Sequence, residues 1–157
     1  MNTAVYKERS ISITTSSGCA SSQIAEWVMM TALTSSWDFS YLHSKQLEHR
    51  WLRTSGSDRD AHNVRGLVGQ RIGILGYGSI GRQIGRLAKA FGMEVLAYTA
   101  SRKTTAEARR DPGYVVPGTG DADGIVPSAW FSGTNTASLH EFLGQSLDML
   151  VLCVPST

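Results

Sequence analysis

Three glycines at a fixed spacing constrain this sequence more than any other feature. Gly76, Gly78 and Gly81 form the pattern G-x-G-x-x-G. The run 71–75 before them is short and apolar without polar alternation, which is typical of a strand covered on both faces of a parallel sheet. Apolar residues then recur at helical spacing, and residues 93–99 again have the pattern of a strand. We therefore predict that residues 70–99 form one βαβ unit.

Each glycine of this pattern has a physical role in holding a dinucleotide. Gly76 permits a sharp turn off the strand, Gly78 lets the backbone approach a pyrophosphate, and Gly81 lets the helix pack closely on the sheet. The N–H groups that begin the helix favour an anion. The alternative interpretation is a purely structural glycine-rich turn. A P-loop is excluded, because Arg82 and Gln83 stand where it needs lysine and then serine or threonine.

Length and composition are those of one globular domain. The chain has 157 residues, 41% of them apolar, and a formal net charge of +2. That charge is too small to indicate a nucleic-acid partner. Cys19 and Cys153 have neither disulfide nor metal-ligand spacing, and no apolar run suits a signal peptide or a membrane span. We expect a cytoplasmic protein without a metal, nucleic-acid or membrane partner.

Two groups of charged residues are expected at the surface. Arg82, Arg86 and Lys89 form a stripe on the helix after the glycine turn, opposite its apolar residues. Asp121 and Asp123 lie in GDADG, which lacks the further ligands of a calcium loop. We interpret both groups as solvated charges.

A long helix is expected before the glycine turn. Ser22 is a candidate cap, and residues 23–51 contain neither proline nor glycine. The alternative is two helices broken near Ser35 and Ser36. Apolar residues cover more than one stripe of this helix. We therefore expect one apolar face to pack on the chain's own sheet and a second apolar face to pack on another subunit. The alternative is that both apolar faces are buried within one chain. The apolar residues are Ile24, Trp27, Val28, Met29, Met30, Leu33, Trp37, Phe39, Tyr41, Leu42, Leu47 and Trp51.

Two segments lack a continuous pattern of helix or strand. Residues 1–21 contain a short strand-like alternation and a Ser/Gly-rich link, and we interpret them as the remnant of a separate domain. Residues 105–137 hold three of the four prolines and five glycines. We expect them to form a long irregular loop that Trp130 and Phe131 anchor.

The last segments complete one half of a doubly wound sheet. We predict a short helix at 139–143 and a third buried strand at 147–154. The order β, α, β, loop, α, β is that of one mononucleotide-binding half. The predicted fold class is thus α/β, a Rossmann-type doubly wound parallel sheet that is incomplete. Residues 70–157 form its first βαβαβ half, and residues 22–157 form a partial NAD(P)-binding domain.

Three segments resemble a known enzyme family. QIAEWV at 23–28, RGLVGQRIGILGYGSIGRQIGRLAKAFGMEVLAY at 65–98 and LDMLVLCVPST at 147–157 are similar to the D-isomer-specific 2-hydroxyacid dehydrogenases, nearest to their glyoxylate and hydroxypyruvate reductase branch. The resemblance implies an oxidoreductase that transfers a hydride between NAD(P)H and a small 2-oxo or 2-hydroxy acid. It also implies a homodimer formed by the helix at 22–52, and it makes residues 1–21 the remnant of a substrate lobe.

The resemblance implies a set of cofactor-binding positions. The family's acid that binds the adenosine ribose corresponds to Thr99, and Ser101, Arg102 and Lys103 follow it. A hydroxyl and a guanidinium can hold a 2′-phosphate that a carboxylate would repel, so we predict a preference for NADP over NAD. The alternative is an exposed basic turn. Besides the three glycines, the implied contacts are Tyr77, Ser79 and Ile80 along the pyrophosphate and Val154 and Pro155 beside the riboses.

The family's catalytic arginine, glutamate and histidine have no counterpart in this sequence. In the family these residues follow the third strand, so we interpret the chain as part of a longer reductase. Its four histidines are His43, His49, His62 and His140, and we expect none of them to be catalytic. The chain is therefore expected to bind cofactor without turnover. A noncatalytic nucleotide-binding or dimerisation module is the alternative function.

Overall fold

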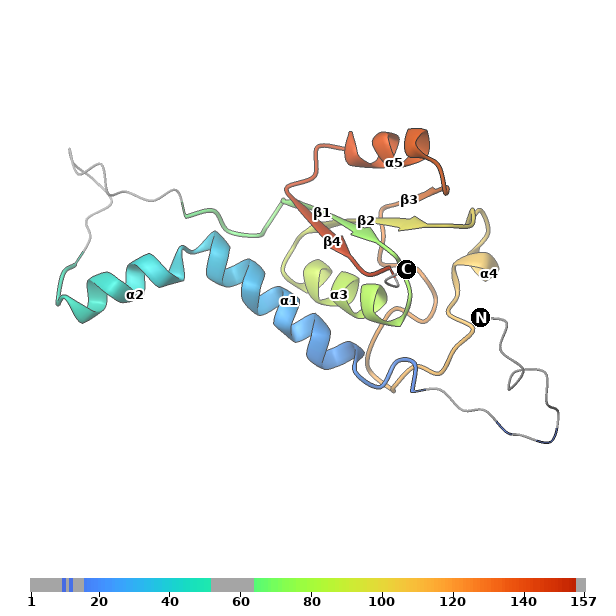
Figure 1. Ribbon diagram of the computed structural model, residues 1–157, viewed down its shortest axis with the longest axis horizontal. Helices are drawn as coiled ribbons and strands as arrows, with labels where there is room; N and C mark the ends of the chain where they lie inside the picture. The colour runs from blue at the N-terminus through green and yellow to red at the C-terminus, as the bar shows by residue number, and fades with distance from the viewer. Residues whose placement is uncertain (1–9, 11, 13–15, 52–63, 155–157) are drawn as a thin grey trace.

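The computed structural model contains a four-stranded parallel sheet with helices on both faces (Figure 1). It describes residues 10, 12, 16–51 and 64–154. The strands are β1 (Arg71–Leu75), β2 (Glu94–Thr99), β3 (Ala129–Ser132) and β4 (Met149–Leu152), in the spatial order β3-β2-β1-β4. Neighbouring strands are parallel. This is the order of the first four strands of a doubly wound sheet, so the predicted fold class is confirmed. The prediction that the strand at 147–154 is the third and completes the first half is wrong, because β3 takes that place beside β2, and β4 pairs with β1 on its other side.

The helices lie in two layers around the sheet. They are α1 (Ser21–Ser36), α2 (Phe39–Leu47), α3 (Ser79–Ala90), the single turn α4 (Ala106–Arg109) and α5 (Thr136–Leu143). Figure 1 shows α3 and α1 on one side of the sheet and α5 on the other, whereas α2 extends away from it. Gly92 follows α3 with a φ of +77°, which suits the helix end predicted there. The βαβ unit from β1 to β2 is therefore formed as predicted.

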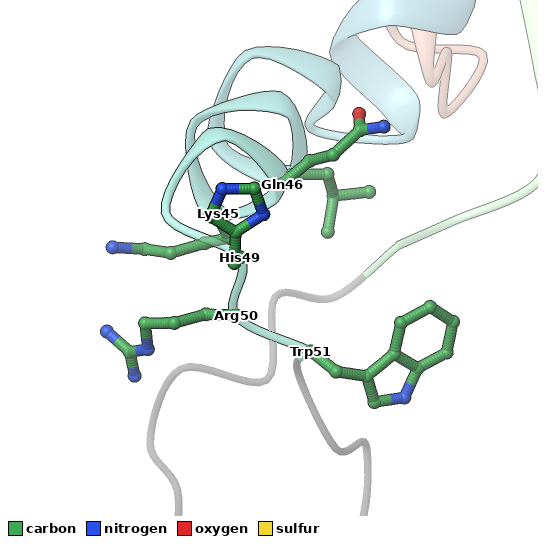
Figure 2. A pocket seen from close by; sticks show the side chains of 6 residues that line it. Lys45, Gln46, His49, Arg50 and Trp51 are labelled. Atoms are coloured by element: carbon green, nitrogen blue, oxygen red, sulfur yellow. The ribbon is translucent and has the colours of Figure 1, made fainter.

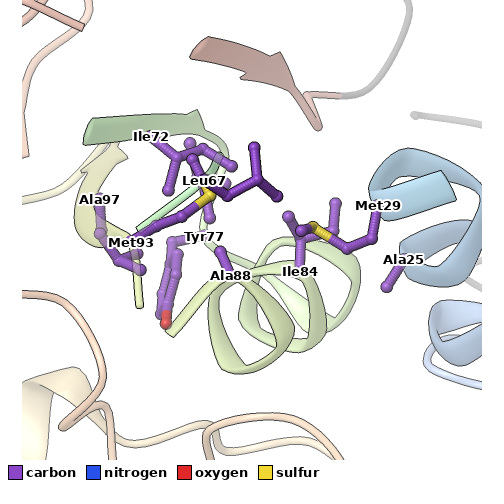
Figure 3. Packing of buried hydrophobic residues seen from close by; sticks show 11 residues of the cluster. Ala25, Met29, Leu67, Ile72, Tyr77, Ile84, Ala88, Met93 and Ala97 are labelled. Atoms are coloured by element: carbon purple, nitrogen blue, oxygen red, sulfur yellow. The ribbon is translucent and has the colours of Figure 1, made fainter. Parts of the chain in front are cut away.

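The main core lies between the sheet, α3 and α1 (Figure 3). Ile72 and Ile74 of β1 and Ile84 of α3 are fully buried in it. Ala25 and Met29 of α1 belong to the same cluster, and Figure 3 shows Met29 directed at Ile84. The buried face of α1 thus packs mainly on α3, not directly on the sheet as predicted.

A smaller core on the other face of the sheet explains the glycine within β1. A Cβ on Gly73 would lie 2.5 Å from Leu147 Cδ1 and 3.0 Å from Phe142 Cζ. Phe142 of α5 is fully buried and packs on Tyr98 and Phe131, with ring centroids 5.1 and 5.5 Å apart. Gly73 therefore makes room for α5 and its following loop.

The long helix expected at 23–51 is broken. The chain forms α1 and α2 with Trp37 and Asp38 between them, which is the two-helix alternative. Asp38 has a φ of +45°, a left-handed conformation that interrupts the helix. The predicted cap is wrong, because Ser22 lies inside α1 and the cap residue is Ala20, without a side-chain hydrogen bond. The strand-like alternation of residues 11 and 13 lies outside the described residues.

The segment 105–137 is more ordered than predicted. It contains α4 and β3, which pairs with β2. Trp130 and Phe131 anchor it from β3, as expected, by packing on Tyr77 and on Phe142. The next helix begins at Thr136, earlier than predicted, because Asn135 caps it by accepting the Ser138 N–H at 2.9 Å.

Strand β4 is half exposed, so the prediction of a strand buried on both faces is wrong. It forms the edge of the described sheet beside β1. Met149 and Val151 pack on the main core, whereas Leu150 and Leu152 are 43% and 65% exposed. An apolar sequence does not distinguish a central strand from an edge strand, because that depends on what lies next to it.

Candidate functional site

The turn between β1 and α3 needs two of its glycines for backbone packing. Gly76 has a φ of +97°, and a Cβ there would lie 2.7 Å from the carbonyl oxygen of Cys153, just after β4. A Cβ on Gly81 would clash with the Gly76 carbonyl oxygen and lie 3.0 Å from Ile74 Cγ2. These two glycines therefore let the strand ends and α3 approach one another closely.

Gly78 differs from them because it faces open space. No atom lies within 4 Å of a Cβ placed there, and its φ of −91° suits any residue. Gly78 is the N-cap residue of α3, and no side chain caps the helix. The first N–H groups of a helix have no partner within it, so the positive end of α3 is open to an anion.

A cleft of about 430 Å³ lies at this turn, where β1, β2 and β4 end. Its lining consists of Ser17, Gly76, Tyr77, Gly78, Ser79, Ile80, Gly81, Thr99, Ala100, Cys153 and Val154. A second hollow of about 330 Å³ shares Gly76, Thr99, Ala100 and Val154 with it and continues to the start of α5. Together they form an elongated site along the carboxyl ends of the strands, the place where open α/β sheets bind ligands.

Most of the expected cofactor-binding residues lie at or beside this cleft. The turn from Gly76 to Gly81 and Val154 line it, whereas Pro155 lies outside the described residues. Ser101 and Arg102 follow the cleft residue Ala100 and are exposed, and Lys103 is half-buried. Sequence reasoning did not find Ser17, Ala100 and Cys153 as lining residues, since no motif marks them.

The side chain of Tyr77 points away from the cleft and into the protein. Its hydroxyl donates to Asp121 Oδ2 at 3.0 Å, and its ring packs edge to face on Trp130 with centroids 5.1 Å apart. Figure 3 shows the ring among the core side chains. Gly85 makes room for it, because a Cβ there would lie 2.7 Å from the Tyr77 hydroxyl. Tyr77 therefore borders the cleft through its main chain.

Two charges predicted to be solvated are in fact buried. Arg82 is 4% exposed and Asp121 is 5% exposed. The Arg82 guanidinium donates to the carbonyl oxygens of Asp121 and Arg109 at 2.5 and 2.6 Å, and its Nε lies 3.4 Å from Asp111 Oδ2. The prediction failed because helical spacing does not reveal that a later segment covers α3. Arg86, Lys89 and Asp123 are exposed, as expected.

A further hollow, of about 540 Å³, lies at the end of α2, remote from the glycine turn (Figure 2). Figure 2 shows the Lys45 and Arg50 side chains directed to one side and Trp51 to the other. Lys45 pairs with Glu48 at 3.0 Å. Because Glu48 already pairs with both Lys45 and Arg50, we assign no ligand to this hollow.

Two other kinds of site were sought among the described residues. No helix there combines the length and the apolar character that a bilayer span requires. Nor do three or more histidine, cysteine, aspartate or glutamate side chains of that part of the chain gather in a way that suits a metal ion. The cleft at the glycine turn is therefore the site that we develop.

Comparison with known proteins gives one family and several partial relatives. The family model described as D-isomer specific 2-hydroxyacid dehydrogenase, NAD binding domain, matches residues 29–117. A hydroxypyruvate reductase of Thermotoga maritima is 26% identical over 99 residues, which are 63% of this chain and 30% of that protein. A glyoxylate reductase of Thermococcus kodakarensis is 35% identical over 91 residues, 58% of this chain and 20% of that protein. The chain thus spans less than a third of the length of these relatives.

One solved structure illustrates the likeness of fold. It is an NADPH-dependent glyoxylate/hydroxypyruvate reductase of Sinorhizobium meliloti in complex with NADP and sulfate. The TM-score is 0.51 at 23% identity, and the match covers 87% of this chain and 33% of that one. At this identity the likeness concerns the fold alone.

Proposed function

Because the chain belongs to the D-isomer specific 2-hydroxyacid dehydrogenase family, through its NAD-binding domain, we propose that it binds a nicotinamide dinucleotide in the cleft at the glycine turn. The observation that carries this proposal is Gly78, which leaves open space directly at the positive end of α3. A pyrophosphate bridge suits that space in size and charge. The hollow that continues to α5 has room for the adenosine.

The cleft residues fit the parts of such a coenzyme. The N–H groups from Gly78 to Ile80 would hold the pyrophosphate, and Thr99 and Val154 would border the riboses. When bound, the coenzyme supplies or accepts a hydride at its nicotinamide ring. The protein's part is to hold and orient it along the strand ends.

Coenzyme binding is tested by calorimetry. NADP⁺ and NAD⁺ are titrated separately into the purified chain, after circular dichroism has verified that it is folded. We expect saturable binding to one site per chain for at least one of the two coenzymes. Folded protein that gives no binding heat with either would contradict the proposal.

We further propose that NADP is preferred over NAD. The loop after β2 carries Ser101 and Arg102 at the surface, and residues 100–106 contain no carboxylate that would repel a 2′-phosphate. Two hydrogen bonds hold the backbone of this loop in place. The Thr99 hydroxyl donates to the Ser101 carbonyl oxygen at 2.8 Å, and Arg109 Nε donates to the Lys103 carbonyl oxygen at 3.2 Å. The exposed Arg102 side chain is thereby carried on a defined turn beside the adenosine hollow.

Replacing Arg102 with alanine is expected to weaken NADP⁺ binding selectively. Loss of one charge-assisted contact to a phosphate costs about 1.5 kcal/mol, or roughly tenfold in Kd. The affinity for NAD⁺ should stay unchanged, since NAD⁺ has no 2′-phosphate. Calorimetry with both coenzymes measures the effect, and Arg110→Ala, another exposed arginine that is paired with Asp123, is the control. Tighter NAD⁺ binding by the unaltered chain would refute the preference.

For the whole protein we propose reduction of a small 2-oxo acid of the glyoxylate or hydroxypyruvate type. The support is family membership and the names of its relatives. In this proposal residues 22–157 form the partial NAD(P)-binding domain and residues 1–21 belong to a substrate lobe. His43, His49 and His140 do not line the cleft, so we expect the isolated chain to be inactive. Turnover of glyoxylate with NADPH by this chain would contradict that expectation. Binding without turnover agrees with it and is also what the alternative function, a noncatalytic nucleotide-binding module, would give.

We also propose that the chain forms a homodimer through the α1–α2 surface. We define this surface by the exposed apolar side chains Ile24, Trp27, Met30, Trp37, Phe39, Leu42, Leu47 and Trp51. Trp27 is 66% exposed and Phe39 is 57% exposed, although both are large and apolar. Patches of this kind mark protein interfaces in globular proteins. Family membership supports a second copy of this chain as the partner that covers the α1–α2 surface.

The double variant Trp27→Glu/Phe39→Glu is expected to be monomeric. Two carboxylates in the α1–α2 surface would have to be buried without partners in the dimer, which is strongly unfavourable. Sedimentation should give a mass near 17.0 kDa for this variant and about twice that for the unaltered chain. Ile125→Glu changes a residue that is 81% exposed outside this surface, so it is the matched control. A monomeric unaltered chain would rule out the dimer.

The cytoplasmic location stays a prediction. Cys19 and Cys153 are both free, which agrees with a reducing compartment. Fractionation of cells that express the tagged protein checks the location, and recovery from a membrane or secreted fraction would contradict it.

A further inference from the structure

Asp121 is a buried carboxylate outside the lining of the cleft. Its Oδ1 accepts the Ile125 N–H at 3.0 Å, and its Oδ2 accepts the Val126 N–H at 3.1 Å. The same Oδ2 also accepts the Tyr77 hydroxyl at 3.0 Å. Asp121 therefore organises its own loop and reaches the glycine turn at the same time.

The loop that carries Asp121 is itself fixed on α3. Arg82 donates to the Asp121 carbonyl oxygen, and Gln83 Oε1 accepts the Gly120 N–H at 2.5 Å. Both helix residues are buried. Asp121 is thus held to α3 through its main chain while its side chain remains directed at Tyr77.

Tyr77 is enclosed on several sides. Trp130 of β3 packs against its ring, the Arg82 guanidinium lies 5.3 Å from the ring centroid, and Gly85 leaves the space that the hydroxyl occupies. Burial raises the pKa of Tyr77 above its usual range, and the nearby Asp121 carboxylate raises it further. The hydroxyl is therefore protonated at neutral pH and donates to Asp121.

Tyr77 lies between Gly76 and Gly78, where the backbone would otherwise be the most flexible part of the turn. We propose that Asp121 and Tyr77 are positioning residues: Asp121 holds the Tyr77 hydroxyl, and this contact fixes the main-chain N–H groups of residues 77–80 in the arrangement that a pyrophosphate requires. The inference rests on the proposed dinucleotide binding. A turn that is already ordered binds more tightly, because less conformational entropy is lost on binding.

The test compares two ligands in the variant Tyr77→Phe, which keeps the ring and removes the hydroxyl. NADP⁺ contains the pyrophosphate bridge, whereas adenosine 2′-monophosphate contains the adenosine end without it. We expect the Kd of NADP⁺ to rise about tenfold, the factor that 1.4 kcal/mol represents, and that of adenosine 2′-monophosphate to stay the same. If the unaltered chain binds NAD⁺ more tightly, NAD⁺ and adenosine replace this pair. The control is Tyr114→Phe, at a tyrosine that is 72% exposed.

A second variant separates positioning from general stability. Asp121→Asn should weaken NADP⁺ binding too, because an NH2 group replaces one of the two oxygens that accept from Tyr77, Ile125 and Val126. The double variant Tyr77→Phe/Asp121→Asn should lose less affinity than the sum of the two single losses, because the two changes share the contact between Tyr77 and Asp121. Affinities are measured well below the melting temperature, on protein shown to be folded by circular dichroism. If Tyr77→Phe does not fold, Asp121→Asn alone is compared with the unaltered chain on the same two ligands.

Four results would overturn the inference. A lower melting temperature with unchanged NADP⁺ affinity would make the contact purely structural, and so would an equal loss of affinity for both ligands. An unaltered chain that binds no coenzyme would remove the proposed function and the inference with it. Normal binding by the unaltered chain together with an unaffected Tyr77→Phe variant would remove the inference alone.

Discussion

Replacing Gly78 with valine is expected to abolish coenzyme binding without unfolding the chain. The backbone of Gly78 has a φ of −91°, and no atom lies within 4 Å of a Cβ placed there, so the protein itself tolerates the side chain. The isopropyl group would instead fill the space in front of α3. Loss of two charge-assisted hydrogen bonds to a phosphate costs about 3 kcal/mol or more, which is at least roughly 100-fold in Kd.

The matched control for this experiment is Gly66→Val. A Cβ on Gly66 also meets nothing within 4 Å, but this glycine is not among the residues that line the cleft. Calorimetry with NADP⁺ should find normal binding by Gly66→Val and none by Gly78→Val, with both variants shown to be folded by circular dichroism. Undiminished binding by Gly78→Val would mean that the phosphate bridge does not lie at the turn.

Replacing Phe142 with alanine is expected to give the largest loss of stability. The side chain is fully buried and packs on Tyr98 and Phe131, and it also lies over Gly73 of β1. Truncating a buried phenylalanine removes apolar burial and leaves a cavity, at a cost of about 3–5 kcal/mol. Whole domains are stable by only about 5–15 kcal/mol, so most of the margin would be lost.

Urea denaturation followed by circular dichroism measures this effect. The control Leu143→Ala changes the neighbouring residue, which is 40% exposed, and should cost much less. Phe142→Leu keeps most of the volume and provides a measurable variant if the alanine protein does not fold. Equal midpoints for Phe142→Ala and Leu143→Ala would show that α5 does not contribute to the core as described.

The parts of the fold that local sequence determines were predicted well. The unit from β1 to β2 is encoded by apolar runs, a helical stripe and glycines that all lie within thirty residues of one another. Strand β3 was missed, because its four residues follow a stretch rich in glycine and proline and become a strand only by pairing with β2. The start of α5 was placed late, because the capping role of Asn135 was not recognised.

The candidate site likewise has features that the sequence predicts and features that it does not. The close packing at Gly76 and Gly81 was predicted from their spacing, since backbone geometry requires it. The inward direction of Tyr77 and its bond to Asp121 join residues that are 44 positions apart. No periodic pattern carries that information, and a charged residue is ordinarily expected in water.

The exposed leucines of β4 have a consequence for any work with this chain in solution. Within the described sheet, β4 has a hydrogen-bonding partner on one side only. Leu150, Leu152 and Val154 expose apolar surface beside its free edge. An unpaired edge strand of this kind can pair with a strand of another chain, so the chains should tend to associate edge to edge in concentrated samples. Growth of that kind would increase with concentration and temperature, whereas pairing through the α1–α2 surface would stop at two copies.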